Sequence, residues 1–334
     1  MKWERKILRA GAIAIALAVV LRLAGGGILT TAVEFLIKPE TGALLLLMET
    51  GRVAYKPPPA QSTPFDPNTE TTAPTDPSLP EKIQATFAPT DADPIYLKNY
   101  TSYPIDKAQL LQSPLSWDLT ESGPAVLIIH THTTESYENT EGYKQSSNYR
   151  THDENYNMVS IGAHLARLLE AAGIGVIHDK TIHDYPSFNG AYENSRASAQ
   201  KYLQEYPSIR LVLDLHRDAF TDGNGKYLGT SVTVNGERVA RMMLVLGSDG
   251  GGLTHPSWKE NTTLAIKLYA QLEKLCPGIC RNLSLTNQRY NQDLCPGALL
   301  FEMGAAGNTR QEALRAAEYL AQAIIDLAYG TKGY

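Results

Sequence analysis

Short apolar runs that each end near a histidine or a carboxylate are the feature of this chain that most constrains its fold. Residues 125–129 form a continuous apolar run, and residues 211–215 and 298–301 form two more that are mostly apolar. Runs of this kind are typical of strands buried on both faces of a sheet. Amphipathic segments with helical spacing alternate with them, such as residues 158–172. We therefore expect an α/β fold in which helices flank a central sheet.

The Asn235-Gly236 pair predicts that this sheet is mixed, although mainly parallel. Asn-Gly is the pair most favoured in tight β-hairpins, and here it separates residues 231–234 from residues 240–246, two predicted strands. An antiparallel pair is therefore expected on the sheet. Residues 309–312, Thr-Arg-Gln-Glu, form a capping box and predict that a terminal helix begins there.

The N-terminal part of the chain differs in composition from the rest. Residues 7–28 are mostly Ala, Leu, Ile, Val and Gly and follow several basic residues, which predicts a transmembrane helix with its N-terminus in the cytoplasm. A cleaved signal peptide is the rival interpretation. Residues 56–93 are rich in Pro, Thr, Ser and Asp and cannot bury enough surface to become ordered. We expect a cytoplasmic tip and anchor at 1–30, a juxtamembrane segment and disordered linker at 31–93, and a folded extracytoplasmic domain at 94–334.

Charge and cysteine content exclude two classes of protein. The chain has 30 Lys plus Arg against 35 Asp plus Glu, with no basic block after the first residues, so no nucleic-acid partner is expected. The three cysteines, Cys276, Cys280 and Cys295, are too few for a disulfide framework. We expect buried or bystander thiols, although pairing or metal binding by Cys276 and Cys280 stays open.

Polar residues near the ends of three predicted strands suggest a metal site. In open α/β sheets, ligands gather at the carboxyl ends of the strands, and His132, His216 and Glu302 stand at such ends. Two histidines and one carboxylate are the ligand set of catalytic zinc sites. Asp153 offers that carboxylate, with Glu154 as an alternative, unless Asp153 only caps the helix that follows.

Further polar residues beside these positions have less specific roles. His130 would point to the opposite side of a continuing strand from its neighbours, so we expect it to be structural or to support a ligand, and whether it replaces His132 stays open. Arg217 and Asp218 follow His216 and could orient ligands or bind a substrate carboxylate. Three further histidines are expected to be solvated or to cap helices: His152, His178 and His183.

The pattern resembles zinc-dependent N-acetylmuramoyl-L-alanine amidases. Residues 126–132, VLIIHTH, align without gaps with the first strand and histidine motif of that family. Asp153 stands four residues before Asn157, as the family's acidic ligand does before a helix-opening Asn, although the family usually has Glu there. Residues 299–304 match the strand that bears its catalytic glutamate. The resemblance implies Zn²⁺ ligands at His132, Asp153 and His216, and a general base at Glu302.

A more specific resemblance is to the stage II sporulation protein P family. The strings HTHTTESY at residues 130–137 and DLHRDA at residues 214–219 carry it, and it extends over about residues 122–327. It implies a membrane-bound enzyme that hydrolyses amide bonds of peptidoglycan at the sporulation septum during engulfment, as an amidase and also as an endopeptidase. It further implies a complex with stage II sporulation proteins D and M.

Two other interpretations stay open. The chain could be a wall-binding scaffold of the engulfment complex with little catalytic activity. It could also be a serine hydrolase that uses Ser136 or Ser231, although the sequence has no Gly-x-Ser-x-Gly elbow. Metal content and inhibition by a chelator distinguish these interpretations from a zinc enzyme.

Overall fold

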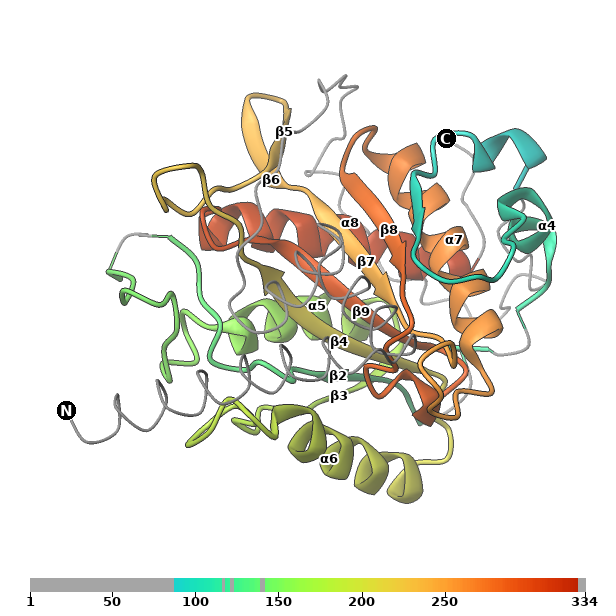
Figure 1. Ribbon diagram of the computed structural model, residues 1–334, viewed down its shortest axis with the longest axis horizontal. Coiled ribbons are helices and arrows are strands. Elements are labelled where there is room, and N and C mark those ends of the chain that lie inside the picture. The colour runs from blue at the N-terminus through green and yellow to red at the C-terminus, as the bar shows by residue number, and fades with distance from the viewer. Residues whose placement is uncertain (1–86, 116–117, 121–122, 139–141, 330–334) are drawn as a thin grey trace, which may run out of the picture. The chain divides into compact units, whose positions relative to one another are not determined.

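The computed structural model describes residues 87–115, 118–120, 123–138 and 142–329, which Figure 1 draws as a coloured ribbon. The predicted anchor and most of the predicted linker lie outside these described residues. Within the described ranges, no helix is both long enough and apolar enough to span a bilayer. All of the described residues belong to one structural unit, residues 55–334.

A seven-stranded sheet lies at the centre of this unit, with the strand order β1-β8-β7-β9-β4-β2-β3. All neighbouring strands are parallel except β7 and β9, which are antiparallel, so the predicted mixed and mainly parallel sheet is confirmed. The strands are β1 (Leu97–Asn99), β2 (Pro124–Ile129), β3 (Gly175–His178), β4 (Leu211–Asp218), β7 (Met242–Leu246), β8 (Cys280–Leu285) and β9 (Ala298–Ala305).

A hairpin with the predicted Asn-Gly turn is present, but its second strand is residues 237–240 and not the predicted residues 240–246, most of which form β7, and it lies outside the main sheet. β5 (Ser231–Val234) and β6 (Glu237–Ala240) pair only with each other. Their turn places Asn235 at φ 50° and Gly236 at φ 82°, the left-handed conformations that a tight hairpin requires. The prediction of an antiparallel pair within the sheet is therefore corrected: the antiparallel neighbours there are β7 and β9.

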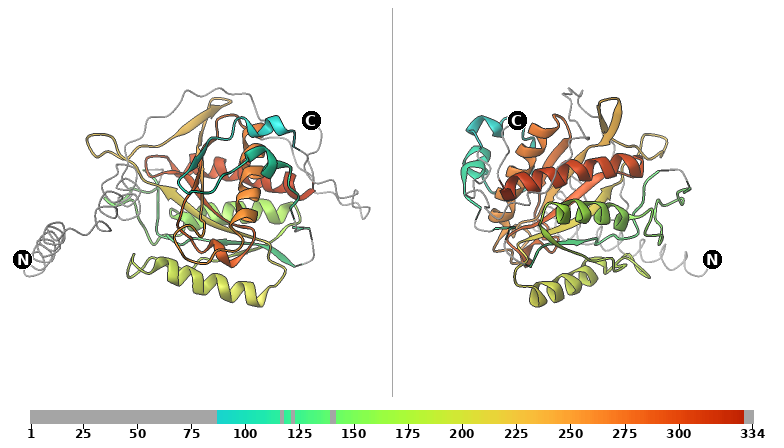
Figure 2. Two further views of the ribbon diagram at one scale, coloured as in Figure 1. Left: turned by 45° about the vertical axis from the view of Figure 1, so that its right-hand side comes forward. Right: turned by 180° about the vertical axis from the view of Figure 1, so that it is seen from behind.

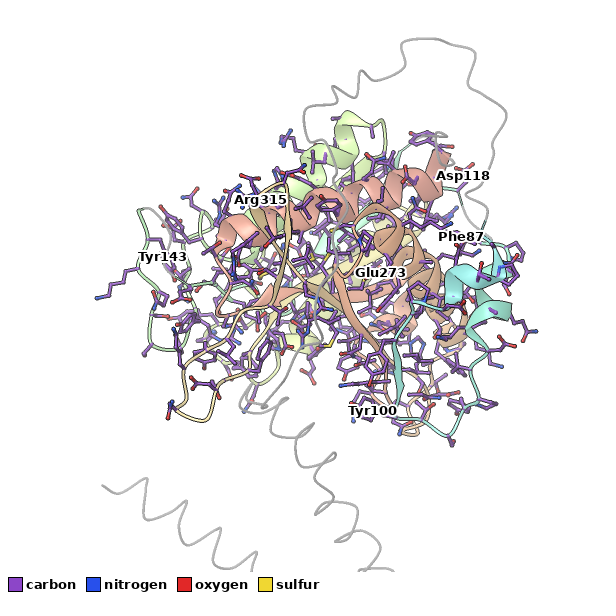
Figure 3. The ribbon with its side chains drawn as sticks, turned by 90° about the horizontal axis from the view of Figure 1, so that it is seen from above. Phe87, Tyr100, Asp118, Tyr143, Glu273 and Arg315 are labelled. Atoms are coloured by element: carbon purple, nitrogen blue, oxygen red, sulfur yellow. The ribbon has the colours of Figure 1, made fainter. Side chains whose placement is uncertain are left out.

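The hairpin is held instead by the C-terminal helix, α8 (Arg310–Tyr329). Arg315, labelled in Figure 3, forms a bidentate pair with Glu237, with both nitrogen–oxygen distances at 2.7 Å. The predicted capping box at the start of α8 is confirmed, because Thr309 Oγ1 accepts from the Glu312 amide and Glu312 Oε2 accepts from the Thr309 amide, each at 3.2 Å.

Helices cover both faces of the sheet (Figures 1 and 2). Helices α5, α7 and α8 share the large apolar core on one face, and α6 packs over a smaller core on the other. The bounds of the remaining helices are α4 (Lys107–Gln112), α5 (Met158–Ala171), α6 (Ala191–Glu205) and α7 (Trp258–Leu275), with short 3₁₀ helices at Pro89–Ala92 and Gln292–Leu294. The three cysteines are buried and free, as expected.

Strand β4 shows how the fold divides its side chains between these faces. Leu213 and Leu215 pack in the large core below α5, α7 and α8, whereas Val212 packs in the smaller core with α6. Because successive side chains of a strand alternate between faces, Asp214 and His216 share the α6 side with Val212. The polar residues Asp214 and His216 of β4 are thereby kept out of the large core.

Phe301 tests the contribution of the large core to stability. Its side chain is fully buried in the middle of β9, so Phe301→Ala is expected to lower the free energy of unfolding by about 3–5 kcal/mol. Leu253→Ala is the control, because Leu253 is 58% exposed, and it should change stability by less than about 0.5 kcal/mol. Urea denaturation followed by circular dichroism measures both, and equal losses would contradict this account of the core.

Candidate functional site

The three strands expected to carry functional groups are neighbours in the order β9-β4-β2 and run parallel. His216 of β4 pairs in register with Glu302 of β9. We expected His216 and Glu302 to stand at the ends of their strands, but both strands continue beyond these residues, to Asp218 and Ala305. His132 lies in the turn just after β2, which ends at Ile129. The fold therefore brings three sequence-distant residues to one edge of the sheet.

The rings of His132 and His216 contact each other edge to face, with centroids 5.1 Å apart and planes at 87°. Nδ1 of His132 is buried and has no hydrogen-bond partner among the described residues. Burial lowers the pKa of His132 to about 3, so its imidazole is neutral, which is the form that binds metals. This pair of imidazoles is the centre of the candidate site.

Asp214, which Thr131 holds in place, lies beside Nε2 of His216. Nε2 of His216 lies 2.9 Å from Oδ1 of Asp214, although the angle falls outside hydrogen-bonding geometry. Asp214 is itself fixed, because Oδ1 accepts from the Thr131 amide at 2.8 Å and Oδ2 from the Thr131 hydroxyl at 2.6 Å. A carboxylate on the far nitrogen of an imidazole is the usual support of a metal-binding histidine.

Glu135 is the carboxylate that stands beside the two histidines, and the sequence analysis did not identify it. Its Oε2 lies 3.7 Å from Nδ1 of His216, and its amide donates to the carbonyl of His132 at 3.1 Å, within the same turn. The His132-Thr-Thr-Glu135 spacing was a signal that could have found it, because residues three apart in a turn share one side.

Two arginines keep Glu135 ionised although it is buried. The Arg217 amide donates to Oε2 at 3.1 Å, and Arg150 Nη2 and Arg217 Nη1 lie 3.3 and 3.6 Å from Oε1. Burial alone would raise the pKa of Glu135, but Arg217 and Arg150, followed by the two histidines, lower it to about 2. Glu135 is therefore an anion at every pH at which the site could work.

The predicted carboxylate ligand, Asp153, is not part of this cluster. Asp153 and its alternative Glu154 are both exposed. Oδ1 of Asp153 accepts from the amide and from Nδ2 of Asn155, each at 2.9 Å. Nor does Asp153 cap α5, because Asn157 accepts from the Val159 amide at 2.9 Å. The position of Asp153 therefore does not support its assignment as the carboxylate ligand. The segment before α5 pairs with the turn after β2 through the Glu135–Arg150 bridge, but the carboxylate that lies beside Nδ1 of His216 is that of Glu135.

Glu302 faces this cluster from β9. Its Oε2 is buried and has no hydrogen-bond partner among the described residues. Burial is the main cause that raises the pKa of Glu302 to about 8, with Asp218 and Glu135 adding to it and His216 opposing it. A carboxyl group with this pKa can both accept and release a proton near neutral pH.

The three supporting residues make contacts within the protein. His130 is fully buried, with Nδ1 3.1 Å from the Leu215 carbonyl and Nε2 2.9 Å from Nε2 of His178. Arg217 donates through Nε to the Ser136 carbonyl at 3.0 Å and through Nη2 to the Tyr149 carbonyl at 2.9 Å, besides its contact with Glu135. Asp218 pairs with Arg281 at 2.6 Å. His130 therefore occupies a structural position, and Arg217 orients Glu135.

Two of the histidines expected to be solvated are at least partly buried. His183 is 1% exposed, with Nδ1 2.9 Å from the His130 carbonyl and Nε2 3.0 Å from Ser198 Oγ. His178 is half-buried against His130, whereas His152 is exposed as expected. The reason for the difference is that both residues pack on the turn after β2, a long-range contact that spacing in the sequence does not reveal.

The types of donor atom in the cluster suit a metal ion, although the side chains lie farther apart than in a site with the metal bound. Among the described residues, no three His, Cys, Asp or Glu side chains stand close enough together to hold a metal as they are. The unpartnered Nδ1 of His132 is buried here, and carboxylates raise the pKa of His216 to about 9 against the effect of burial. A buried imidazole nitrogen without a hydrogen-bond partner in the described part of the chain, next to a second imidazole and a carboxylate, is the donor chemistry that zinc prefers.

Among solved structures, the chain is similar to several amidases. These are the N-acetylmuramoyl-L-alanine amidase from Clostridium difficile 630 (16% identity, 64% of this chain and 100% of that chain, TM-score 0.38), Ami1 from Mycobacterium smegmatis (11%, 64% and 99%, TM-score 0.41), and the CwlD amidase from Clostridioides difficile in complex with the GerS lipoprotein (12%, 62% and 95%, TM-score 0.36). All three TM-scores are below 0.5, so the family assignment depends on the sequence matches.

Those sequence matches extend over most of the chain. Stage II sporulation protein P of Bacillus subtilis (strain 168) is 29% identical over 213 residues, which are 60% of this chain and 50% of that protein. The chain thus spans about half the length of the curated relative it matches. Residues 58–325 match the family model described as Stage II sporulation protein P (SpoIIP). Because this match includes well over half of the residues, the chain belongs to the stage II sporulation protein P family.

Proposed function

We propose that this chain is a zinc-dependent hydrolase that cleaves amide bonds of peptidoglycan, as an N-acetylmuramoyl-L-alanine amidase does. The observation that carries the proposal is the convergence of His132, Glu135 and His216 with Glu302 at the adjacent ends of β2, β4 and β9. Membership of the stage II sporulation protein P family supports the choice of substrate.

His132, Glu135 and His216 are the residues that would hold the metal. Glu135 replaces Asp153 in this assignment because it is a buried carboxylate that lies 3.7 Å from Nδ1 of His216 and belongs to the same turn as His132, whereas Asp214 lies at the other ring nitrogen of His216. When bound, zinc acts as a Lewis acid and lowers the pKa of a coordinated water molecule towards about 7. Asp214 would keep the ring of His216 in its orientation, and Arg217 would do the same for Glu135.

Glu302 is the proposed general base and acid. Its carboxyl group lies in register with His216 on the neighbouring strand, so it faces the site from the side opposite the turn that carries His132. It would accept a proton from the attacking water and deliver that proton to the nitrogen of the leaving amine. The pKa of about 8 that burial gives Glu302 suits both steps.

We further propose the setting that the family membership suggests. The enzyme would be anchored in the cell membrane with its catalytic domain outside the cytoplasm, and would act at the sporulation septum during engulfment. Cleavage of stem-peptide cross-links as an endopeptidase is proposed as a second activity. Stage II sporulation proteins D and M are the proposed protein partners, because the resemblance to the family implies that complex.

The serine-hydrolase interpretation receives no support from the positions of the two serines. Ser136 is fully buried, and its Oγ lies 3.0 Å from the hydroxyl of Tyr143. Ser231 is half-buried on the hairpin strand β5. None of the hydrogen bonds described for either hydroxyl involves a histidine, which a nucleophilic serine would need as its base.

Glu135→Gln and Asp153→Asn together test the ligand assignment. We expect Glu135→Gln to weaken zinc binding at least about tenfold, because it removes a charged ligand, whereas Asp153→Asn should retain the zinc content of the unmodified chain. Elemental analysis of the purified full chain after equilibration with zinc measures both. The reverse result would restore Asp153 as the ligand. An unmodified chain that holds no zinc would favour the scaffold interpretation.

Glu302→Gln tests the proposed base. The substitution removes the proton carrier but no metal ligand, so turnover of purified peptidoglycan should fall about 10²–10⁴-fold while zinc content stays unchanged. Mass spectrometry of the released fragments measures the activity and identifies the bond that is cut. Turnover within a few-fold of the unmodified chain would exclude Glu302 as the base.

The same substitution makes a prediction about stability in the presence of a chelator. The pKa of Glu302 is about 8 in the folded chain and about 4.3 in the unfolded chain. At a pH between these two values, the carboxyl group is protonated in the folded chain but ionised in the unfolded chain. The contribution of Glu302 to the stability of the unmodified chain should therefore fall as pH rises from about 4 to 8, and Glu302→Gln should lack this loss. Urea denaturation should show no advantage for the variant near pH 4 and an advantage on the order of a few kcal/mol at pH 8. A difference that is constant with pH would contradict the burial of this carboxyl.

A further inference from the structure

The loop between β3 and α6, residues 179–190, is fastened to the turn that carries His132. The Asp184 carboxylate is fully buried, accepts from the amide and hydroxyl of Thr134 at 3.2 and 2.6 Å, and pairs with Arg150 at 2.5 Å. Thr133 Oγ1 donates to the Thr181 carbonyl at 2.8 Å. Buried, fully paired polar groups of this kind hold a loop in a single conformation.

The same loop leaves two aromatic rings in contact with solvent. Phe188 is 40% exposed and Tyr185 is 59% exposed. The ring of Phe188 stacks on the imidazole of His132, with centroids 4.3 Å apart and planes within 9°, and the Arg150 guanidinium lies 4.7 Å from its centroid. Tyr185 meets the ring of His152 edge to face at 4.5 Å. Exposed aromatic rings on a rigid loop beside a reaction centre are typical of a binding surface.

The charges near these rings favour an uncharged ligand over an anionic peptide. Arg150 already forms ion pairs with two buried carboxylates, at 2.5 and 3.3 Å. Asp153 and Glu154 are exposed and directly follow the histidine that Tyr185 contacts, so they would repel a carboxylate-rich stem peptide. Lys180 stands apart from the rings in sequence, at the start of the loop next to β3. An uncharged sugar ring can place its apolar C–H face on an aromatic ring and its hydroxyls in water.

We propose that Phe188 and Tyr185 form a sugar-binding subsite on which the glycan side of the substrate stacks beside the scissile amide. The inference deepens the proposed function, on which it rests for the identity of the glycan. Phe188 would also fix the ring plane of His132, so the two roles must be separated by experiment.

Binding measured without turnover tests the subsite. In the Glu302→Gln full chain loaded with zinc, we expect N-acetylglucosamine tetramer to bind about tenfold more weakly after Phe188→Ala, because a stacking face is lost. Tyr185→Ala should produce a smaller loss, and Phe188→Tyr should restore most of the affinity. Isothermal titration calorimetry with this neutral glycan and, separately, with a glycan-free stem tetrapeptide provides the comparison.

Zinc content and the peptide probe decide between the subsite and its rivals. The proposal expects Phe188→Ala to keep its zinc and its affinity for the tetrapeptide. Loss of zinc, or equal weakening of both probes, would show that Phe188 only supports His132 and would overturn the subsite. Weakening of the peptide alone, or no glycan binding by the Phe188-containing chain, would also overturn it. Phe188-dependent glycan binding by a chain that cleaves no peptidoglycan would refute the proposed function while leaving the subsite intact.

Discussion

The parallel pairing of β4 with β2 on one side and β9 on the other determines where each polar group of the site can stand. Asp214 is in register with Ile129 at the end of β2, and His216 is in register with Glu302 of β9. Because side chains alternate along a strand, Asp214 and His216 lie on the same face, one supporting the other. A shift of one residue in this pairing would move His216 into the apolar core.

A buried anion is the second constraint, and the chain meets it with arginines from two separate segments. An unpaired carboxylate in the position of Glu135 would be strongly destabilising. Arg217 belongs to β4, whereas Arg150 belongs to the segment that leads to α5 and forms a bridge with Glu135 itself. The two guanidiniums therefore do more than neutralise charge. They tie the turn after β2 to the central strand and to the segment before the helix.

The sequence allowed the strands of the site to be predicted but not all of its side chains. Apolar or mostly apolar runs identify β2, β4 and β9, and the polar residues that follow these runs point to His132, His216 and Glu302 because strand ends gather ligands. Asp153 could not be placed in the same way, because the path of its loop depends on contacts such as Arg217 with the Tyr149 carbonyl, far apart in the chain. The burial of His183 depends likewise on the distant His130 carbonyl. Glu135 was accessible in principle, since its spacing from His132 is local.

The loop of residues 179–190 combines two properties that usually oppose each other. Burial of an exposed phenyl ring is favourable, yet Phe188 stays 40% exposed on a loop whose buried Asp184 is bonded to Thr134 and Arg150. Asp184 in turn holds Thr134, which adjoins Glu135, and Phe188 itself rests on the ring of His132. A ligand that stacks on the Phe188 ring would therefore act on a loop that is in direct contact with the turn carrying His132 and Glu135. Recognition at the loop and orientation of those two side chains thus depend on one rigid set of contacts, which is a physical reason for the ring to stay exposed there.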